Sequence, residues 1–171
     1  MIEEKINIIL NYLKVGDFKY VIMETIKLSN KNPKNSYLKN LLGLAYLEIG
    51  ETIKAVENLN LAKDAYNKGN FKAAFKYWKP LAKDGIPEAQ LGLGLLYGKG
   101  QGLLQDYKVS VKWFKLAADQ GNKDAQFYIG MAYINGISYK KNYSFAYMWL
   151  SVAAIRKNRL AKDTLPKFIK M

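Results

Sequence analysis

The sequence predicts an all-α protein, a right-handed α-solenoid of stacked antiparallel helix pairs with about ten helices. Two observations predict this class. Segments of the chain repeat at fixed periods of 34 and 36 residues, and apolar residues within each repeat recur every three or four positions. Proline is also scarce, with four residues in 171, so that helices can run uninterrupted. Short amphipathic helices cannot bury their apolar faces alone, so each pair must stack on its neighbours.

The second half of the chain holds the clearer repeat, with a period of 36. The segment GIPEAQLGLGLLYGKGQGLLQDYKVSVKWFKLAADQ from Gly85 aligns without a gap with GNKDAQFYIGMAYINGISYKKNYSFAYMWLSVAAIR from Gly121. Gly94 and Gly130 share one position inside the helical pattern, where glycine costs about 1 kcal/mol relative to alanine. We therefore expect a neighbouring helix to approach closely at both glycines.

The first half repeats with a period of 34. Tyr12 aligns with Tyr46, and Gly16 aligns with Gly50. Glycine adopts the left-handed backbone conformation that ends helices, so we expect Gly16 and Gly50 to end the first helix of each pair. The stretch NKNPKN at 30–35 should separate one pair from the next, because the residue before a proline disfavours helix.

Helix patterns and turn residues together give the expected elements. The helices are expected at 2–14, 17–31, 36–49, 52–68, 71–84, 87–98, 106–120, 123–134, 142–157 and 159–169, with longer loops at 99–105 and 135–141. Asp17, Asp106 and Asn142 precede helices and should cap their first turns. Pro80 lies inside the fifth helix, where we expect a kink or a split.

Two known repeat families resemble different parts of this pattern. AYNKGNFKAAFKYWKPLAKDG and AQLGLGLLYGKGQGLLQDY resemble Sel1-like repeats, and the likeness covers residues 66–157. FAYMWLSVAA resembles the way in which many bacterial members close their arrays. Residues 2–64 are similar to tetratricopeptide repeats, through Leu42, Gly43, Tyr46, Ala55, Leu59 and Ala62. The resemblance implies tetratricopeptide-like repeats at 1–64, Sel1-like repeats at 65–157 and a basic C-terminal capping helix or tail at 158–171. The two registers would share a helix at 52–68, as a natural junction or an engineered one.

The composition removes the most common catalytic chemistry. The chain contains neither cysteine nor histidine, so it lacks thiolate nucleophiles, cysteine zinc sites and the usual general base near neutral pH. The glycine-rich stretch at 92–102 lacks the preceding strand and the Gly-Lys-Ser/Thr ending of a phosphate loop. A hydrolase would need a carboxylate pair that the sequence does not display. We expect no enzyme activity, and we assign no catalytic, cofactor-binding or metal-binding residues.

Positive charge is concentrated in the second half. Residues 1–64 carry nine Lys/Arg and eight Asp/Glu, whereas residues 65–171 carry eighteen and six, which together give the net charge of +13. Two interpretations stay open. The basic half could bind a polyanion or an anionic membrane surface, or its lysines could simply be a solvated surface.

The repeat class and the missing catalytic residue types favour a scaffold or adaptor. A peptide or protein would bind in the concave groove that the first helices of the pairs line. The candidate binding residues are apolar or polar side chains on those helices, namely Asn40, Leu44, Leu47, Leu91, Leu95, Phe127, Tyr128 and Met131. Six aromatic residues at repeat positions should instead pack in the core: Tyr46, Tyr97, Tyr133, Trp78, Trp113 and Trp149.

The remaining expectations concern partners and location. We expect a protein or peptide partner, no nucleic acid and no membrane span, with peripheral membrane contact left open. The first residues, MIEEKINIIL, carry glutamates where a secretory signal carries basic residues, which favours a cytoplasmic protein. The chain should be a monomer or associate weakly with itself. End-to-end assembly through the ends of the array is a further alternative.

Overall fold

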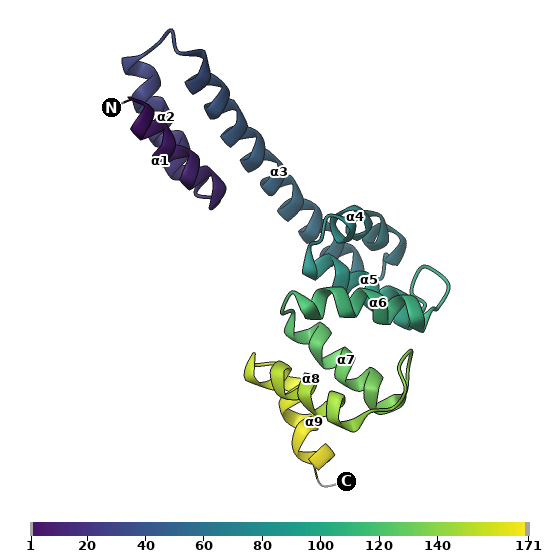
Figure 1. The fold of residues 1–171 in the computed structure, drawn as a ribbon. Helices are drawn as coiled ribbons and strands as arrows, with labels where there is room; N and C mark the ends of the chain where they lie inside the picture. Colours follow the sequence, from purple (N-terminus) through teal and green to yellow (C-terminus); the bar gives the residue numbers. More distant parts are fainter. Residues whose placement is uncertain (1, 170–171) are drawn as a thin grey trace. The chain divides into compact units, whose positions relative to one another are not determined.

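The computed structural model describes residues 2–169, and every regular element in that range is an α-helix (Figure 1). The helices are α1 (Ile2–Lys14), α2 (Phe18–Lys31), α3 (Ser36–Asn67), α4 (Phe71–Lys83), α5 (Pro87–Lys99), α6 (Tyr107–Asp119), α7 (Lys123–Asn135), α8 (Tyr143–Ile155) and α9 (Arg159–Ile169). The all-helical class is confirmed, with nine helices in the described part of the chain instead of about ten.

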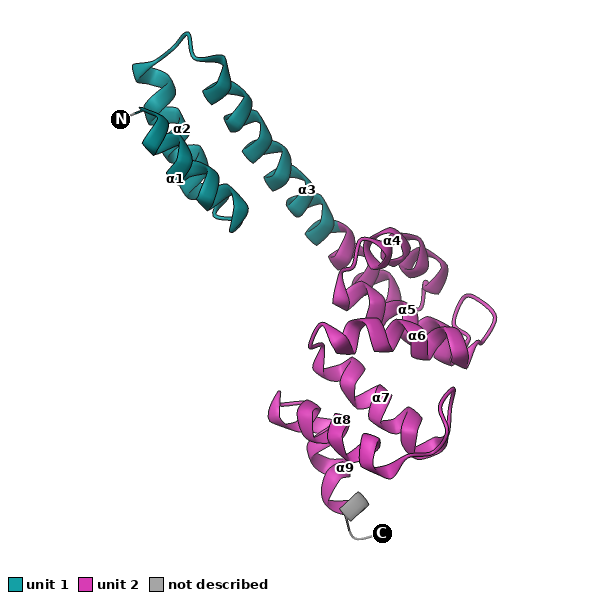
Figure 2. Ribbon diagram, viewed as in Figure 1, with its two compact units in different colours: residues 1–57 teal, residues 58–171 magenta. Residues whose placement is uncertain are grey.

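The chain divides into two compact units (Figure 2). Unit 1 is Met1–Glu57 and unit 2 is Asn58–Met171, so that α3 begins in the first and ends in the second. In unit 1, α1 and α2 form a hairpin that turns at Gly16, which has a φ of +80°. The hairpin and the first turns of α3 enclose a small core of Ile9, Val21, Leu28, Leu38, Leu41 and Ala45.

In unit 2, each helix from α4 to α8 packs against the helix that follows it. Gly94 of α5 lies directly under the Phe114 ring of α6, and a Cβ at Gly130 of α7 would lie 2.8 Å from Leu150 Cγ of α8. The expected close approach at both glycines is therefore confirmed. It allows the paired helices to bury alanines between them, among them Ala117, Ala132 and Ala153.

Side chains at equivalent repeat positions join each pair to the next. Gln90 Nε2 donates to the Ala82 carbonyl at 3.2 Å, and Gln126 Nε2 donates to the Ala118 carbonyl at the same distance. Both glutamines are buried, so these bonds satisfy polar groups that would be costly to leave unpaired. Gln90 and Gln126 thus link the first turns of α5 and α7 to the end of the helix before each.

The helix ends follow the expected residue types with one exception. Asp17, Asp106 and Asn142 each accept a hydrogen bond from a backbone N–H in the first helical turn, which confirms them as N-caps. Gly100 and Gly136, with φ of 66° and 72°, end α5 and α7. The loops that follow are close to the expected ones. The exception lies in α3.

The expected helices at 36–49 and 52–68 are wrong as separate elements, because α3 continues through Gly50. Gly50 does not have the positive φ that Gly16 has, and no heavy atom lies within 4 Å of a Cβ built there. Tyr46 was expected in the core, but 53% of its surface is exposed. The segment after Gly50 does not fold back, because its last residues pack within unit 2. There Tyr66 packs against Trp78, with ring centroids 5.5 Å apart.

Of the two outcomes expected at Pro80, the split is wrong, since α4 runs without interruption from Phe71 to Lys83, whereas the kink stays a prediction. Pro80 lies in the last turn and is exposed, so its ring faces solvent and only one backbone hydrogen bond is lost. Among the other aromatic residues expected in the core, Trp78 is buried, whereas Tyr97, Trp113, Tyr133 and Trp149 are half-buried.

Gly130→Leu should lower the free energy of unfolding by about 1–3 kcal/mol, because the new side chain would enter the space of Leu150. The same change at Gly50 is a matched control, since its surroundings are open and leucine favours helix over glycine. Denaturant unfolding at low protein concentration measures both variants. Equal stability of Gly130→Leu and the unaltered chain would contradict the close packing of α7 on α8.

Candidate functional site

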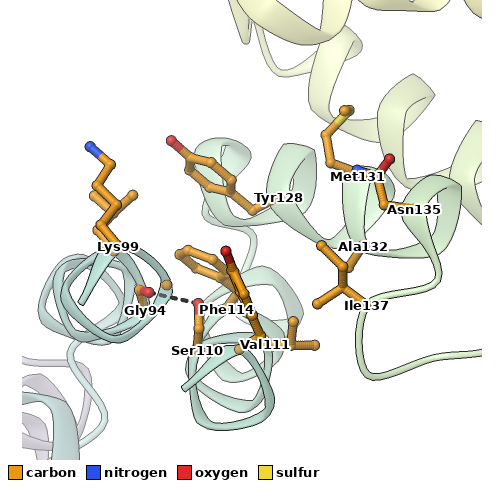
Figure 3. Close-up of a pocket in the computed structure, with 13 residues that line it drawn as sticks. Gly94, Lys99, Ser110, Val111, Phe114, Tyr128, Met131, Ala132, Asn135 and Ile137 are labelled. Carbon is orange, nitrogen blue, oxygen red and sulfur yellow. Dashed lines mark hydrogen bonds between the residues drawn. The ribbon is translucent and has the colours of Figure 1, made fainter. Parts of the chain in front are cut away.

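Two adjoining hollows in unit 2 form the most developed concave surface among the described residues. The first has a volume of about 190 Å³ and lies among α5, α6 and α7 (Figure 3). The second has a volume of about 580 Å³ and lies among the last turns of α3, α5 and the start of α7. Leu95 lines both of them, so we treat them together as the α5–α7 groove.

The first hollow is apolar because its walls are rings, methyl groups and glycines. Phe114 and Tyr128 form one wall, stacked with their ring centroids 4.6 Å apart and an interplanar angle of 10°. The one hydroxyl at the base, that of Ser110, donates to the Gly94 carbonyl at 2.7 Å. This polar pair is satisfied within the protein, so it does not oppose the binding of an apolar group.

The polar groups of two side chains lie at one edge of this hollow. Figure 3 shows the Lys99 ammonium of α5 and the Tyr128 hydroxyl of α7 pointing the same way. Lys99 Nζ donates to the Tyr66 hydroxyl at 3.1 Å, and this hydrogen bond raises the pKa of Lys99. Burial raises the pKa of Tyr128. At neutral pH the edge therefore holds a full positive charge beside an uncharged phenol.

The second hollow combines an apolar base with charged sides. Trp78 and Leu91 lie at its base, and Glu88, Lys123 and Asp124 are among its other lining residues. Asp124 is held in place by Asn158, whose Nδ2 donates to Asp124 Oδ1 at 2.6 Å. This hollow can take polar groups of both charges next to an apolar contact.

Four of the predicted binding residues lie together here. Leu91 and Leu95 of α5 and Tyr128 and Met131 of α7 all line the groove. Phe127 does not line it, because its side chain packs against the core of Leu150, Ala153 and Ala161 in the last helices. Phe127 and Tyr128 are adjacent on α7 and therefore point to different sides of the helix, a distinction that aromatic character alone does not reveal.

The other predicted residues, Asn40, Leu44 and Leu47, lie on α3 within unit 1. All three are exposed, and none lines the α5–α7 groove. Sequence reasoning also missed some lining residues. Tyr107 and Val111 come from α6, and Ile137 comes from the loop after α7. The sequence predicts binding residues on the first helix of each pair. Residues on the second helix of a pair or in a loop were therefore not expected to line the groove.

No three His, Cys, Asp or Glu side chains gather closely enough in residues 2–169 to hold a metal ion. No described helix is both long and apolar enough to cross a membrane.

The fold and the groove define a protein of the α-solenoid class, and the comparisons identify the type of repeat. The family model described as Sel1 repeat matches residues 87–122 and 123–158. Each of the two matched segments is one helix pair, α5–α6 and α7–α8. The match confirms the expected Sel1-like region over residues 87–158, whereas the tetratricopeptide likeness of residues 2–64 stays a prediction.

Solved structures of Sel1-type proteins resemble the chain. A Sel1 repeat protein from Oxalobacter formigenes is 29% identical, with a TM-score of 0.61 over 68% of this chain and 91% of its own. A protective antigen of uropathogenic Escherichia coli that displays an SLR fold is 26% identical, with a TM-score of 0.61 over 93% of this chain. The chain spans 35% of the length of that antigen. A comparison with curated proteins finds no match.

Tyr128→Ala should lower the free energy of unfolding by about 2–4 kcal/mol, because it removes the ring stacked on Phe114 and opens the wall of the first hollow. Tyr128→Phe keeps the stacked ring and should unfold within about 1 kcal/mol of the unaltered chain. Chemical denaturation followed by circular dichroism measures both variants. Equal losses in the two would show that the hydroxyl, and not the ring, holds the wall.

Proposed function

We propose that this chain is a protein-interaction scaffold that binds a peptide or a protein segment in the α5–α7 groove. The observation that carries the proposal is the apolar hollow that lies open beside Lys99 and continues at Leu95 into a second, more polar hollow. Repeat proteins of this class present the helices of successive pairs along an extended concave surface. The groove therefore suits an elongated partner that contacts α5 and α7 in turn.

The size of the first hollow favours a side chain of a partner over a free metabolite. Small-molecule sites have volumes of roughly 300–1,000 Å³. The first hollow, with about 190 Å³, is smaller than this, whereas the second, more polar hollow, with about 580 Å³, falls within the range. One apolar side chain of a bound peptide would be its occupant. Lys99 at the edge would pair with a carboxylate that follows or precedes this anchor, since its pKa is raised and it stays protonated.

The proposal extends to binding without catalysis and without a cofactor, in the cytoplasm. Asn40, Leu44 and Leu47 on α3 remain proposed partner contacts of unit 1, because they are exposed on a helix that resembles the first helix of a tetratricopeptide pair. Loss of partner capture by Leu44→Ala, with an unchanged helical spectrum, would support that part.

Met131→Ala and Lys99→Ala should each weaken peptide binding by about tenfold, which corresponds to about 1.4 kcal/mol. Peptides selected from a random display library on the unaltered chain would serve as probes, with affinities measured by calorimetry. We expect the selected peptides to share an apolar residue next to an acidic one. Leu116→Ala is the control, because Leu116 is exposed on α6 and lines neither hollow. Unchanged affinity in both groove variants would contradict the assignment.

A second candidate function is electrostatic binding of a polyanion or an anionic membrane surface. Lys72, Lys76, Lys79 and Lys83 recur at spacings of four, three and four residues, so they follow one face of α4, and all four are exposed. The helix carries no acidic residue to offset them. A positive stripe of this kind attracts phosphate and sulfate groups.

The electrostatic candidate predicts binding to heparin that weakens steeply with salt. Changing the four lysines of α4 to glutamine should reduce the slope of log affinity against log salt by about 0.7–0.9 for each cation removed from the contact. The matched control changes Lys5, Lys14, Lys19 and Lys31 of unit 1 to glutamine, which removes the same charge elsewhere. Equal slopes for both quadruple variants would reject the α4 stripe as the binding surface.

A further inference from the structure

One face of α3 in unit 1 is exposed although its residues recur in the pattern of a helix seam. The positions are separated alternately by four and three residues, the spacing with which apolar residues recur along the contact line of paired helices. Tyr46 is 53% exposed and Ile53 is 54% exposed, so about half of each side chain is uncovered. The face consists of Lys39, Gly43, Tyr46, Gly50, Ile53 and Glu57.

This face lies away from the part of α3 that the chain itself covers. Leu38, Leu41 and Ala45 are at most 3% exposed and pack in the core with α1 and α2. In a helix of 3.6 residues per turn, Gly43 and Gly50 lie on nearly the opposite side. Along this segment, α3 thus has one covered face and one uncovered face.

The two glycines distinguish the uncovered face from ordinary helix surface. Each lies inside a helix, where glycine costs about 1 kcal/mol relative to alanine. In unit 2, Gly94 and Gly130 lie against neighbouring side chains, so close packing explains them. A Cβ at Gly43 or Gly50 would meet no atom within 4 Å. Among the described residues, no other side chain or helix occupies the space that these two glycines leave free.

We propose that a second copy of this chain covers this face, through antiparallel pairing of the two α3 helices about a twofold axis near residue 48. This register places Gly43 of one copy opposite Ile53 of the other, and Gly50 opposite Tyr46. Each large side chain then meets a position without a side chain. At both ends of the pair, Lys39 lies opposite Glu57 of the second copy, so the charges are complementary.

A single register satisfies all of these contacts at once, and this match favours a second copy of the chain over any other partner. A parallel pair would place Lys39 opposite Lys39 and the glycines opposite each other, which gives repulsion and a void. An unrelated partner would have no reason to match both the size pattern and the charges. The contact covers only residues 39–57, so we expect a weak dimer, below the size of most stable interfaces. This proposal does not rest on the α5–α7 groove.

The first experiment follows mass against concentration by light scattering and sedimentation velocity with the full chain. The unaltered chain should change from monomer to dimer as its concentration rises. Ile53→Glu should remain a monomer, because it places a buried charge opposite Gly43. Tyr37→Glu is the matched control, since Tyr37 is 48% exposed, belongs to the same helix and lies outside the face. Circular dichroism verifies that all variants keep their helical content.

A charge exchange then tests the register. Lys39→Glu and Glu57→Lys should each raise the dissociation constant of the dimer by about fivefold, because each places like charges opposite each other twice. The double variant Lys39→Glu/Glu57→Lys should return the dissociation constant close to that of the unaltered chain. A monomer at every concentration would overturn the proposal. So would a dimer that Ile53→Glu leaves intact, or a double variant that fails to recover.

Discussion

The close contact between a glycine on one helix and a large side chain on the next is the constraint on which unit 2 depends. At Gly94, the absence of a side chain lets the Phe114 ring lie against the backbone of α5. The same ring then stacks on Tyr128 of α7 at 4.6 Å. One contact therefore seats α6 on α5 and also builds the wall of the first hollow. Packing within the repeat and the shape of the groove are consequences of a single arrangement.

Hydrogen bonds that recur with the period of 36 residues hold this arrangement together. Buried Gln90 and Gln126 bond to equivalent carbonyls, and Gln120 donates to the Gly85 carbonyl at 2.8 Å, as Arg156 donates to the Gly121 carbonyl at 3.2 Å. A change in the length of one repeat would leave the buried amides of Gln90 and Gln126 without these partners, which costs more than the bonds themselves contribute. These hydrogen bonds hold α5 and α7 at the spacing that forms the groove.

The sequence predicted best those features that depend on local chemistry. Asp106 and Asn142 cap helices because their side chains reach a nearby N–H, and Gly100 and Gly136 end helices because they adopt a positive φ. Leu95 and Met131, which the sequence proposes as partner contacts, both line the groove because it follows the faces of α5 and α7. Phe127 packs against the last helices, and Ile137 reaches the first hollow from a loop. Neither position follows from the spacing of apolar residues along one helix.

Gly16 and Gly50 show why equal local signals gave different structures. After Gly16, α2 finds Ile9 of α1 to pack against, so turning back buries apolar surface. After Gly50, the residues that could turn back are already engaged, since Ala62 is fully buried and Tyr66 packs on Trp78. A continuous helix keeps every backbone hydrogen bond and loses none of that packing, so the turn does not form. Gly50 thus carries the helix penalty of a glycine, and no other described part of the chain packs closely against it. In a contact between two chains, Gly50 would have a structural role, because it would leave room for a large side chain of the other copy.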